Sequence, residues 1–151
     1  MIAEDDPLRP DVTALLERHL GFAHEVTPAG HVHALDVHRL LDPSVTFFSA
    51  RRDGELLGVG ALRELDPSHG EVKSMHTASA ARRQGVGRAM VEHLLAVARA
   101  RGYERVSLET GTMDAFAPAR ELYLAIGFVP CAPFGEYTAN PHSVCMTLAL
   151  Q

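Results

Sequence analysis

Hydrophobic residues in the first half of the chain follow first a helical and then a strand period. From Pro10 to Phe22 they recur at helical spacing, with Gly21 as a candidate end of the helix. From Val45 to Arg52 β-forming residues dominate, and Asp53-Gly54 is a strong hairpin signal. An apolar pattern containing glycines resumes from Glu55 to Leu65. These residues predict a helix followed by two antiparallel strands.

The second half continues with a strand and then changes period. After a turn over 66–70, residues 71–77 are expected to form a third strand of the same meander. Apolar residues then recur along one helical stripe, at Val86, Met90, Leu94, Val97 and Ala98, with Gly102 as its cap. Further along, the pattern predicts a strand over Arg105 to Thr110, a helix over Pro118 to Ile126 ended by Gly127, and extended segments near Phe128 and from Ser143 to Leu150.

This order of elements, in a chain of 151 residues, is typical of one α/β (α+β) domain built around a single sheet, spanning residues 1–151. No apolar run approaches the roughly 18 residues that span a bilayer. The acidic opening Met1-Ile2-Ala3-Glu4-Asp5-Asp6 lacks the features of a secretory signal. We therefore expect a cytoplasmic protein with no membrane partner.

Charge and composition narrow the chemistry further. The net charge of -5 argues against nucleic acid as a partner. Cys131 and Cys145 have neither zinc-site nor disulfide-framework spacing, so we expect both to be reduced and packed. His31, His33 and His38 raise the question of a metal site, but the stretch resembles a loop running into a short helix and has no other ligands at a recognised spacing. No metal is predicted.

The most informative segment runs from Arg82 to Gly87, between a strand and a long helix. Glycines at such a junction let a ligand approach the backbone, and the unpaired N–H groups of a helix start favour an anion such as phosphate. A dinucleotide fingerprint needs glycine where Met90 stands, and a P-loop needs Gly-Lys-Ser/Thr, which is absent. The surrounding sequence is basic, with arginines at 82, 83, 88, 99, 101 and 105.

The same segment resembles the signature Gln/Arg-x-x-Gly-x-Gly/Ala of the GNAT superfamily of acyl-CoA-dependent N-acetyltransferases, which is met by Arg82, Gly85 and Gly87. Downstream, the tract from Ala119 to Phe128 is similar to the family's later helix and following strand, through Ala119, Leu122, Tyr123, Gly127 and Phe128. The likeness covers roughly residues 45–150 and points to a bacterial branch of poorly defined substrate. Phe116 stands where many members have asparagine.

The resemblance implies a mixed, mostly antiparallel sheet flanked by helices, with splayed strands that form a cleft for acetyl-CoA. The pyrophosphate would be held by backbone N–H groups from Arg83 to Arg88. Backbone groups of Met75 and Thr77 would contact the pantetheine arm, with the Met75 N–H as an oxyanion donor. The implied cofactor-binding residues are Met75, His76, Thr77, Arg82, Arg83, Gln84, Gly85, Val86, Gly87 and Arg88.

Two residues are predicted to be catalytic. By resemblance Tyr123 is the acid that protonates the departing CoA thiolate, although a core tyrosine also fits its helical face. Glu71, four residues before Met75, is the candidate base, with Glu109 and His76 as competitors. Strand alternation would put Glu71 and Met75 on one side unless a bulge intervenes. Glu71 also fits the role of a solvated carboxylate paired with Lys73.

The expected activity is acetyl transfer to a primary amine of a small or amino-acid-like molecule by direct attack. The alternatives are a protein lysine or N-terminal acetyltransferase and an acyl-CoA-binding module without turnover. A homodimer is compatible with all of these functions. The loop over 134–142 joins the last two strands and is positioned to shape an acceptor site, with Glu136, Tyr137 and His142 as weaker candidates.

Overall fold

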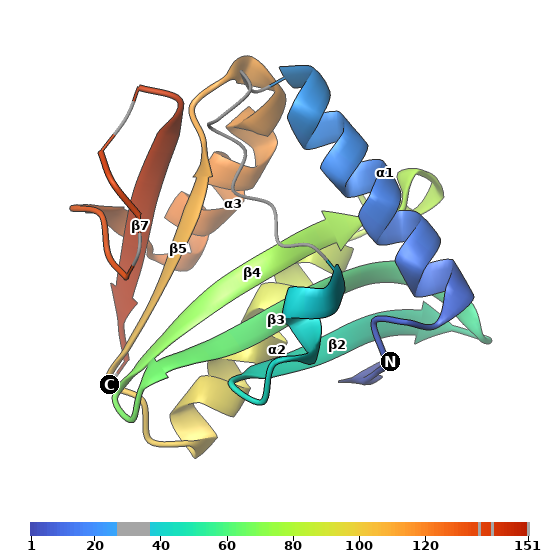
Figure 1. Ribbon diagram of the computed structural model, residues 1–151, viewed down its shortest axis with the longest axis horizontal. Helices are drawn as coiled ribbons and strands as arrows, with labels where there is room; N and C mark the ends of the chain where they lie inside the picture. The colour runs from blue at the N-terminus through green and yellow to red at the C-terminus, as the bar shows by residue number, and fades with distance from the viewer. Residues whose placement is uncertain (27–36, 136, 140, 151) are drawn as a thin grey trace.

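The fold is centred on a single open sheet. The computed structural model describes residues 1–26, 37–135, 137–139 and 141–150. Within them, seven strands lie in the order β1-β2-β3-β4-β5-β7-β6, and every neighbouring pair is antiparallel except β4 with β5 (Figure 1). The strands are β1 (Ile2–Glu4), β2 (Val45–Arg52), β3 (Glu55–Asp66), β4 (His69–Thr77), β5 (Arg105–Gly111), β6 (Val129–Cys131) and β7 (Ser143–Ala149).

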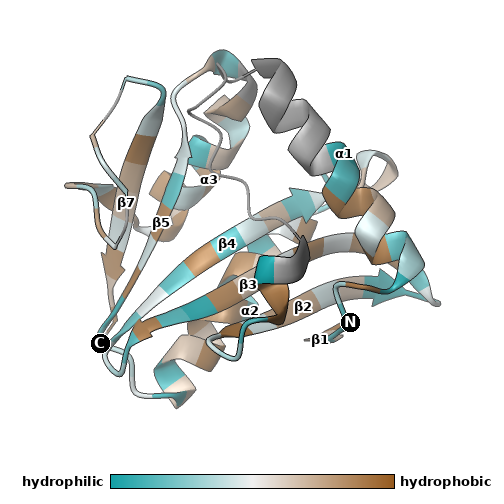
Figure 2. Cartoon of the chain, viewed as in Figure 1, coloured by the Kyte–Doolittle hydropathy of each residue, from teal (hydrophilic) through white to brown (hydrophobic). Residues whose placement is uncertain are grey.

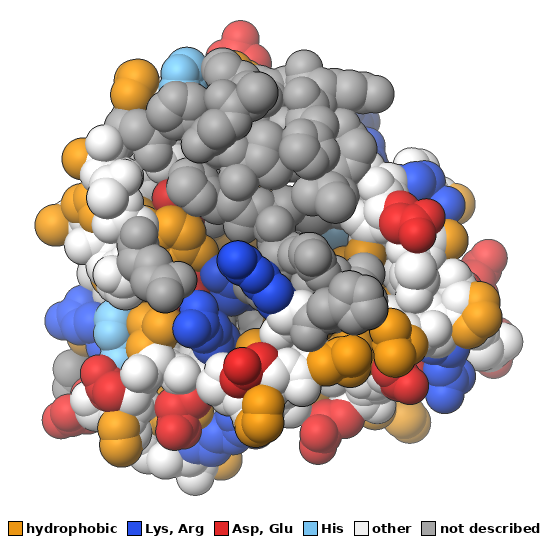
Figure 3. All heavy atoms as spheres, in the orientation of Figure 1, with side chains coloured by type: hydrophobic (Ala, Val, Ile, Leu, Met, Phe, Trp, Pro, Cys, Tyr) orange, Lys and Arg blue, Asp and Glu red, His pale blue; other side chains and the backbone are white. Residues whose placement is uncertain are grey.

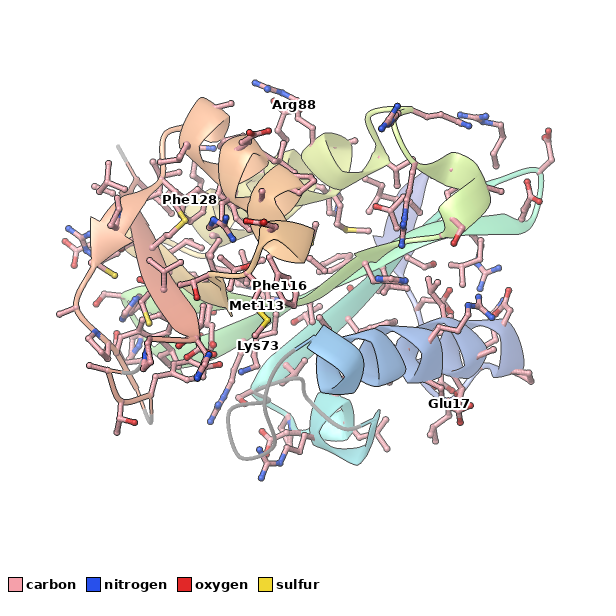
Figure 4. The ribbon with its side chains drawn as sticks, turned by 90° about the horizontal axis from the view of Figure 1, so that it is seen from above. Glu17, Lys73, Arg88, Met113, Phe116 and Phe128 are labelled. Atoms are coloured by element: carbon pink, nitrogen blue, oxygen red, sulfur yellow. The ribbon has the colours of Figure 1, made fainter. Side chains whose placement is uncertain are left out.

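Helices cover both faces of this sheet. They are α1 (Pro10–Val26), α2 (Val86–Ala100) and α3 (Ala117–Ile126), with short 3₁₀ turns η1 (Val37–Leu41), η2 (Ser79–Ala81) and η3 (Asp114–Phe116). In Figures 1 and 4, α1 lies on one side of the sheet and α2 and α3 on the other. None of the described helices is long and apolar enough to cross a membrane.

Each face has its own hydrophobic cluster, because successive strand residues point to opposite sides. Val12, Leu15 and Leu16 of α1 pack with Phe47, Val59 and Ala61. The larger cluster on the opposite face includes Met90 and Leu94 of α2 and Tyr123 of α3. Figure 2 shows the resulting change between brown and teal along β3 and β4.

Two glycines of β3 let α2 lie close to the sheet. A Cβ at Gly58 would stand 2.9 Å from Val86 Cγ1, and one at Gly60 would stand 2.7 Å from Met90 Cγ. Real Cβ atoms do not come so near, so any side chain at Gly58 or Gly60 would push α2 away. These glycines therefore fix how closely the start of α2 approaches β3 and β4.

A bulge in β4 precedes the point where the sheet opens. Val59 pairs with His76 but Ala61 pairs with Lys73, which leaves one extra residue on β4, and Ser74 has a φ of 55°. The parallel pairing with β5 covers only His69 to Glu71. Beyond Glu71 the two strands diverge (Figure 1), as the resemblance implied. The expected fold class is confirmed.

The sequence-based boundaries differ from the structure in three places. Helix α1 continues through Gly21 to Val26, since a single interior glycine weakens a helix without ending it. The edge strand β1 was not predicted, because its three residues take their register from β2 and carry too short a pattern of their own. The turn between β3 and β4 is shorter than 66–70. His31 and His33 lie outside the described residues, as does the side chain of His38.

Candidate functional site

The segment before α2 presents an open helix start. Arg83 and Gly85 both have positive φ, 65° and 78°, which turns the backbone sharply into Val86. No side chain bonds to the N-terminal cap at Gly85, and no acidic residue lies in the first turn of α2. The first N–H groups of the helix have no partner within it, so this end attracts an anion.

Gly87 faces the space beside α3 and β4. A Cβ at Gly87 would lie 3.5 Å from Leu122 Cδ2 and 3.7 Å from Thr77 Oγ1, which are ordinary contacts. The folded protein thus has room for a small side chain here. The absence of one leaves the backbone of the first helical turn accessible from the side of Thr77.

The side chains around this loop are exposed. Arg82, Arg83 and Gln84 are all on the surface, and Gln84 Nε2 donates a hydrogen bond of 3.2 Å to the Ala80 carbonyl. Arg88 pairs with Glu92 at 3.5 Å, one turn along the helix. An exposed pair of this kind contributes little to stability, so Arg88 can exchange Glu92 for another anion at small cost.

The bulge decides which way β4 side chains point. Met75 packs with the cluster on the α2 face, and its Sδ would meet a Cβ at Gly60 at 2.8 Å. Glu71 and Lys73 belong to the other face, because the extra residue at Ser74 reverses the alternation; the bulge that the sequence leaves open as an exception therefore separates Met75 from them. The backbone of β4 after Glu71 does not pair with β5, so this edge of β4 faces the gap between the two diverging strands.

A buried polar cluster lies on the α1 face of this opening. Glu71 is 1% exposed. Its Oε2 is 3.1 Å from Lys73 Nζ and accepts a hydrogen bond of 2.6 Å from the hydroxyl of Tyr137. Lys73 Nζ also donates to the Tyr137 oxygen at 2.6 Å. Lys73 is the single lysine of the chain, and Figure 4 places it below Met113 and Phe116. The Tyr137 hydroxyl therefore joins the loop to the buried Glu71–Lys73 charge pair of β4.

Glu109 lies on β5, the strand that diverges from β4. Burial raises its pKa to about 7, whereas a hydrogen bond with Ser143 and the charge of Lys73 lower it, and the charge of Glu71 adds to the increase. A carboxyl group with this pKa exchanges its proton near neutral pH. On the face of the molecule that Figure 3 shows, blue Lys and Arg side chains lie near the middle, beside hydrophobic ones.

Tyr123 lies in the larger hydrophobic cluster, so the alternative of a core tyrosine describes its packing. It is 6% exposed, and its ring meets that of Phe128 edge-on with centroids 5.8 Å apart. Burial raises the pKa of its phenol to about 12. The phenol is thus protonated at neutral pH, which is the state a proton donor requires.

The end of β5 is held by α3 and η3. Arg120 donates hydrogen bonds of 2.7 Å and 2.9 Å to the carbonyls of Gly111 and Met113. The ring of Phe116 occupies the space where Gly111 would carry a Cβ. Phe116, which stands where the resemblance leads one to expect asparagine, thus puts an apolar ring beside the end of β5.

Sequence reasoning brought some of these residues together and missed others. One of its two interpretations of Glu71 paired the carboxylate with Lys73 but placed it in solvent, and Tyr137 was only a weaker candidate of the loop. The contact between Tyr137 and β4 spans 64 and 66 residues of sequence, a distance no local pattern reports. Glu136 lies outside the described residues. The carbonyl of His142 accepts a hydrogen bond from the Thr112 N–H, away from the cluster.

Comparisons with known proteins agree with this arrangement. Residues 10–128 match the model of the acetyltransferase (GNAT) family. The chain is 45% identical over 146 residues to YsnE of Bacillus subtilis (strain 168), named an uncharacterized N-acetyltransferase, covering 97% of each. It is 44% identical over 149 residues to YedL of Escherichia coli (strain K12), of the same description, covering 99% of this chain and 94% of YedL. An IAA acetyltransferase of Azospirillum brasilense is 36% identical over 146 residues, with coverage of 96% and 94%.

Solved structures show the same fold. An acyl-CoA N-acyltransferase from Klebsiella pneumoniae subsp. pneumoniae superposes with a TM-score of 0.80 at 25% identity, covering 100% of this chain and 97% of that one. A GNAT family acetyltransferase from Elizabethkingia anophelis, solved with acetyl-CoA bound, gives 0.73 at 17% identity, with coverage of 99% and 97%. The family match and the relatives named N-acetyltransferases show an acyl-CoA-dependent acetyltransferase. The chain belongs to the GNAT family.

Proposed function

We propose that this acetyltransferase moves the acetyl group of acetyl-CoA to a primary amine of a small or amino-acid-like molecule, at the opening between β4 and β5. The observation that carries the proposal is Glu109, a half-buried carboxyl group with a pKa raised to about 7, standing across from the Glu71–Lys73 pair. Amines of pKa about 10 are almost wholly protonated at neutral pH, so transfer needs such a proton acceptor.

The residues around the opening fit acetyl-CoA. The uncapped start of α2 and the free approach to Gly87 suit a pyrophosphate, which backbone N–H groups from Arg83 to Arg88 would hold, with the side chains of Arg82 and Arg83 nearby. The unpaired edge of β4 from Met75 to Thr77 suits the amides of the pantetheine arm. When bound, acetyl-CoA supplies an activated thioester.

Glu109 is the residue to which we assign the amine proton, in preference to Glu71. The Oε2 atom of Glu71 already receives bonds from Lys73 and Tyr137, so Glu71 holds the lysine and the loop in place. Glu109 has the pKa suited to taking a proton and returning it to water near pH 7. His76 remains a competitor by position on β4.

Tyr123 and Met75 would serve the other half of the reaction. The Tyr123 hydroxyl, kept protonated by burial, donates its proton to the departing thiolate. The N–H of Met75, on the edge of β4 that does not pair with β5, would donate to the thioester oxygen as negative charge develops there. The reversal at Ser74 directs the Met75 side chain into the core and leaves this backbone clear.

A small acceptor is favoured over a protein chain because a loop covers the cluster. The rings of Phe134 and Tyr137 meet edge-on with centroids 5.2 Å apart, and Tyr137 bonds directly to Glu71 and Lys73. This leaves the Lys73 side chain 9% exposed. A groove for an extended polypeptide would leave that face of the sheet open. The Azospirillum brasilense relative, named for IAA, is also named for a single compound.

Thioester consumption with acetyl-CoA and a panel of amines tests the proposal. Small amines and amino acids should be acetylated faster than lysine-containing or N-terminal peptides at equal concentration, and calorimetry should show CoA binding. Faster acetylation of peptides would make the protein-directed alternative correct. Binding without consumption by any amine would identify a non-catalytic acyl-CoA module.

A further inference from the structure

The two cysteines of the chain face each other across neighbouring strands. Cys131 of β6 is the direct partner of Cys145 of β7, and both are free thiols. Directly opposed residues of antiparallel strands point to the same face, with Cα atoms about 4.5 or 5.5 Å apart. Disulfides join Cα atoms about 4.4 to 6.8 Å apart, so this pair meets the main geometric requirement.

We propose that Cys131 and Cys145 are a site of reversible disulfide formation, closed by a low-molecular-weight disulfide such as oxidised glutathione. Side chains opposed on a sheet stand slightly farther apart at Cβ than in a relaxed disulfide. The bond therefore requires a small movement, and β6, with three residues at the edge of the sheet, is the strand that can make it. A bond of this kind is easily reduced again.

The reaction proceeds by two thiol–disulfide exchanges. Cys131, which is half-buried on the edge strand, attacks oxidised glutathione as its thiolate and releases one glutathione thiolate. Cys145 then attacks Cys131 Sγ, forming the protein disulfide and releasing the second. Two protein thiols are oxidised, one glutathione disulfide is reduced, and the two protons pass to the two released thiolates.

Burial slows this exchange because it raises the pKa of both thiols. It raises the pKa of Cys131, and it raises the pKa of Cys145 to about 11, with a further increase from the charge of Glu109. Only the thiolate attacks, so closure should be slow at neutral pH and faster in alkali. This dependence separates the pair from highly reactive surface thiols.

The bond would reach the acceptor side of the site, a consequence that rests on the proposed function. Cys145 is also the direct partner of Glu109 on β5, so all three residues share one face. The backbone N–H of Phe134 bonds to Cys145, and the ring of Phe134 meets that of Tyr137 edge-on. Drawing Cys145 Sγ toward β6 removes the Phe134 bond and loosens the loop that Tyr137 ties to Glu71. Acetylation should fall.

Oxidation of the full-length protein tests the site. After incubation with oxidised glutathione at pH 8, thiols titrated under denaturing conditions should fall from two to none, with an intact-mass loss of about 2 Da that dithiothreitol restores. Non-reducing peptide mapping should recover the segment around Cys131 linked to the segment around Cys145. The yield should be independent of protein concentration, since the bond is within one chain.

Cys131→Ser is the matched control. It should keep one titratable thiol, show no mass loss, and retain its acetylation rate under the same oxidant. A wild-type product that stays at the stage of one glutathione adduct, or that links two chains, would overturn the proposal. Closure without any change in acetylation would leave the disulfide site established and would remove only its effect on the acceptor side.

Discussion

A single carboxyl group dominates the electrostatics of the site. Glu109 has a folded-state pKa of about 7 against an ordinary value of 4.5, so the native state binds its proton more tightly than the unfolded state does. Its contribution is therefore favourable at low pH and is lost as the pH rises from about 4.5 to about 7. Above that window the ionised group is a net cost.

Glu109→Gln should accordingly stabilise the protein at pH 8 and change little at pH 4. After discounting for partial exposure, the gain at pH 8 is about 1 to 2 kcal/mol. Chemical denaturation at both pH values measures it. Equal effects at the two pH values would mean that the Glu109 carboxyl group titrates normally.

The same residue should shape the activity profile. With a good acceptor, wild-type kcat should rise with pH through about 7, as Glu109 loses its proton. Glu109→Gln should lower kcat about 100-fold at pH 7 and recover as alkali supplies free amine. Glu71→Gln is the matched comparison. Its kcat should still rise with pH through about 7, although the substitution removes the carboxylate that pairs with Lys73. If only Glu71→Gln abolished this rise of kcat with pH, Glu71 and not Glu109 would be the base.

Tyr123 combines core packing with a proton that is hard to lose. Tyr123→Phe keeps the ring against Phe128 and removes only the hydroxyl, so the fold should be retained. We expect kcat to fall by about 100-fold or more, with CoA affinity unchanged in calorimetry. Wild-type turnover, under conditions where the chemical step is rate-limiting, would leave Tyr123 with a packing role alone.

At the scale of elements, the start of α2 has the clearest test. Gly87→Ala fits without close contacts and should stabilise the helix by up to about 1 kcal/mol, whereas Gly87→Leu fills the approach to its first N–H groups. Gly87→Leu should weaken CoA binding at least tenfold in calorimetry. Ala89→Leu, at an exposed position of the same turn, is the control. Unchanged affinity in Gly87→Leu would place the pyrophosphate elsewhere.

Elements with local signals were predictable from the sequence. The hairpin at Asp53-Gly54 has φ values of 53° and 82°, which that dipeptide adopts readily, and Gly127 ends α3 with φ of 122°. The spacing from Val86 to Ala98 gave the buried face of α2. In each case residues close in the sequence determine the local structure.

Elements set by distant contacts were not predictable. Whether Met75 shares the side of Glu71 depends on a bulge at Ser74, where a serine with positive φ has no sequence signal. The pKa of Glu109 on β5 depends on Ser143 of β7 and on Lys73 and Glu71 of β4. The resemblance named the candidate segments, but the roles that we propose for Glu71 and Glu109 rest on contacts that the sequence does not report.

The sheet as a whole consists of two arms, β1 to β4 and β5 to β6, whose strands pair with each other only over the first residues of β4 and β5. The β4 arm continues the antiparallel pairing with β3, and the β5 arm continues it with β7. A ligand lying between the arms contacts both and adds its binding energy to the fold. CoA at 100 times its Kd should stabilise the native state by about 2.7 kcal/mol.

Hydrogen exchange can locate that stabilisation. Amides of β4 after the bulge should gain protection on CoA binding, because they have no partner on β5. Amides in the middle of β2, paired on both sides, serve as the internal reference. Protection confined to the surface of α2, with none on β4, would contradict a ligand between the arms.

The scarcity of lysine has its own consequence for an enzyme of this kind. Thirteen arginines and one lysine supply the basic residues, and the lysine is buried in a charge pair with Glu71. Guanidinium groups stay protonated, and a buried ammonium group bonded to a carboxylate is neither nucleophilic nor accessible. The protein therefore offers its own cosubstrate almost no side-chain amine to modify, and it should resist chemical self-acetylation during long exposure to high concentrations of acetyl-CoA.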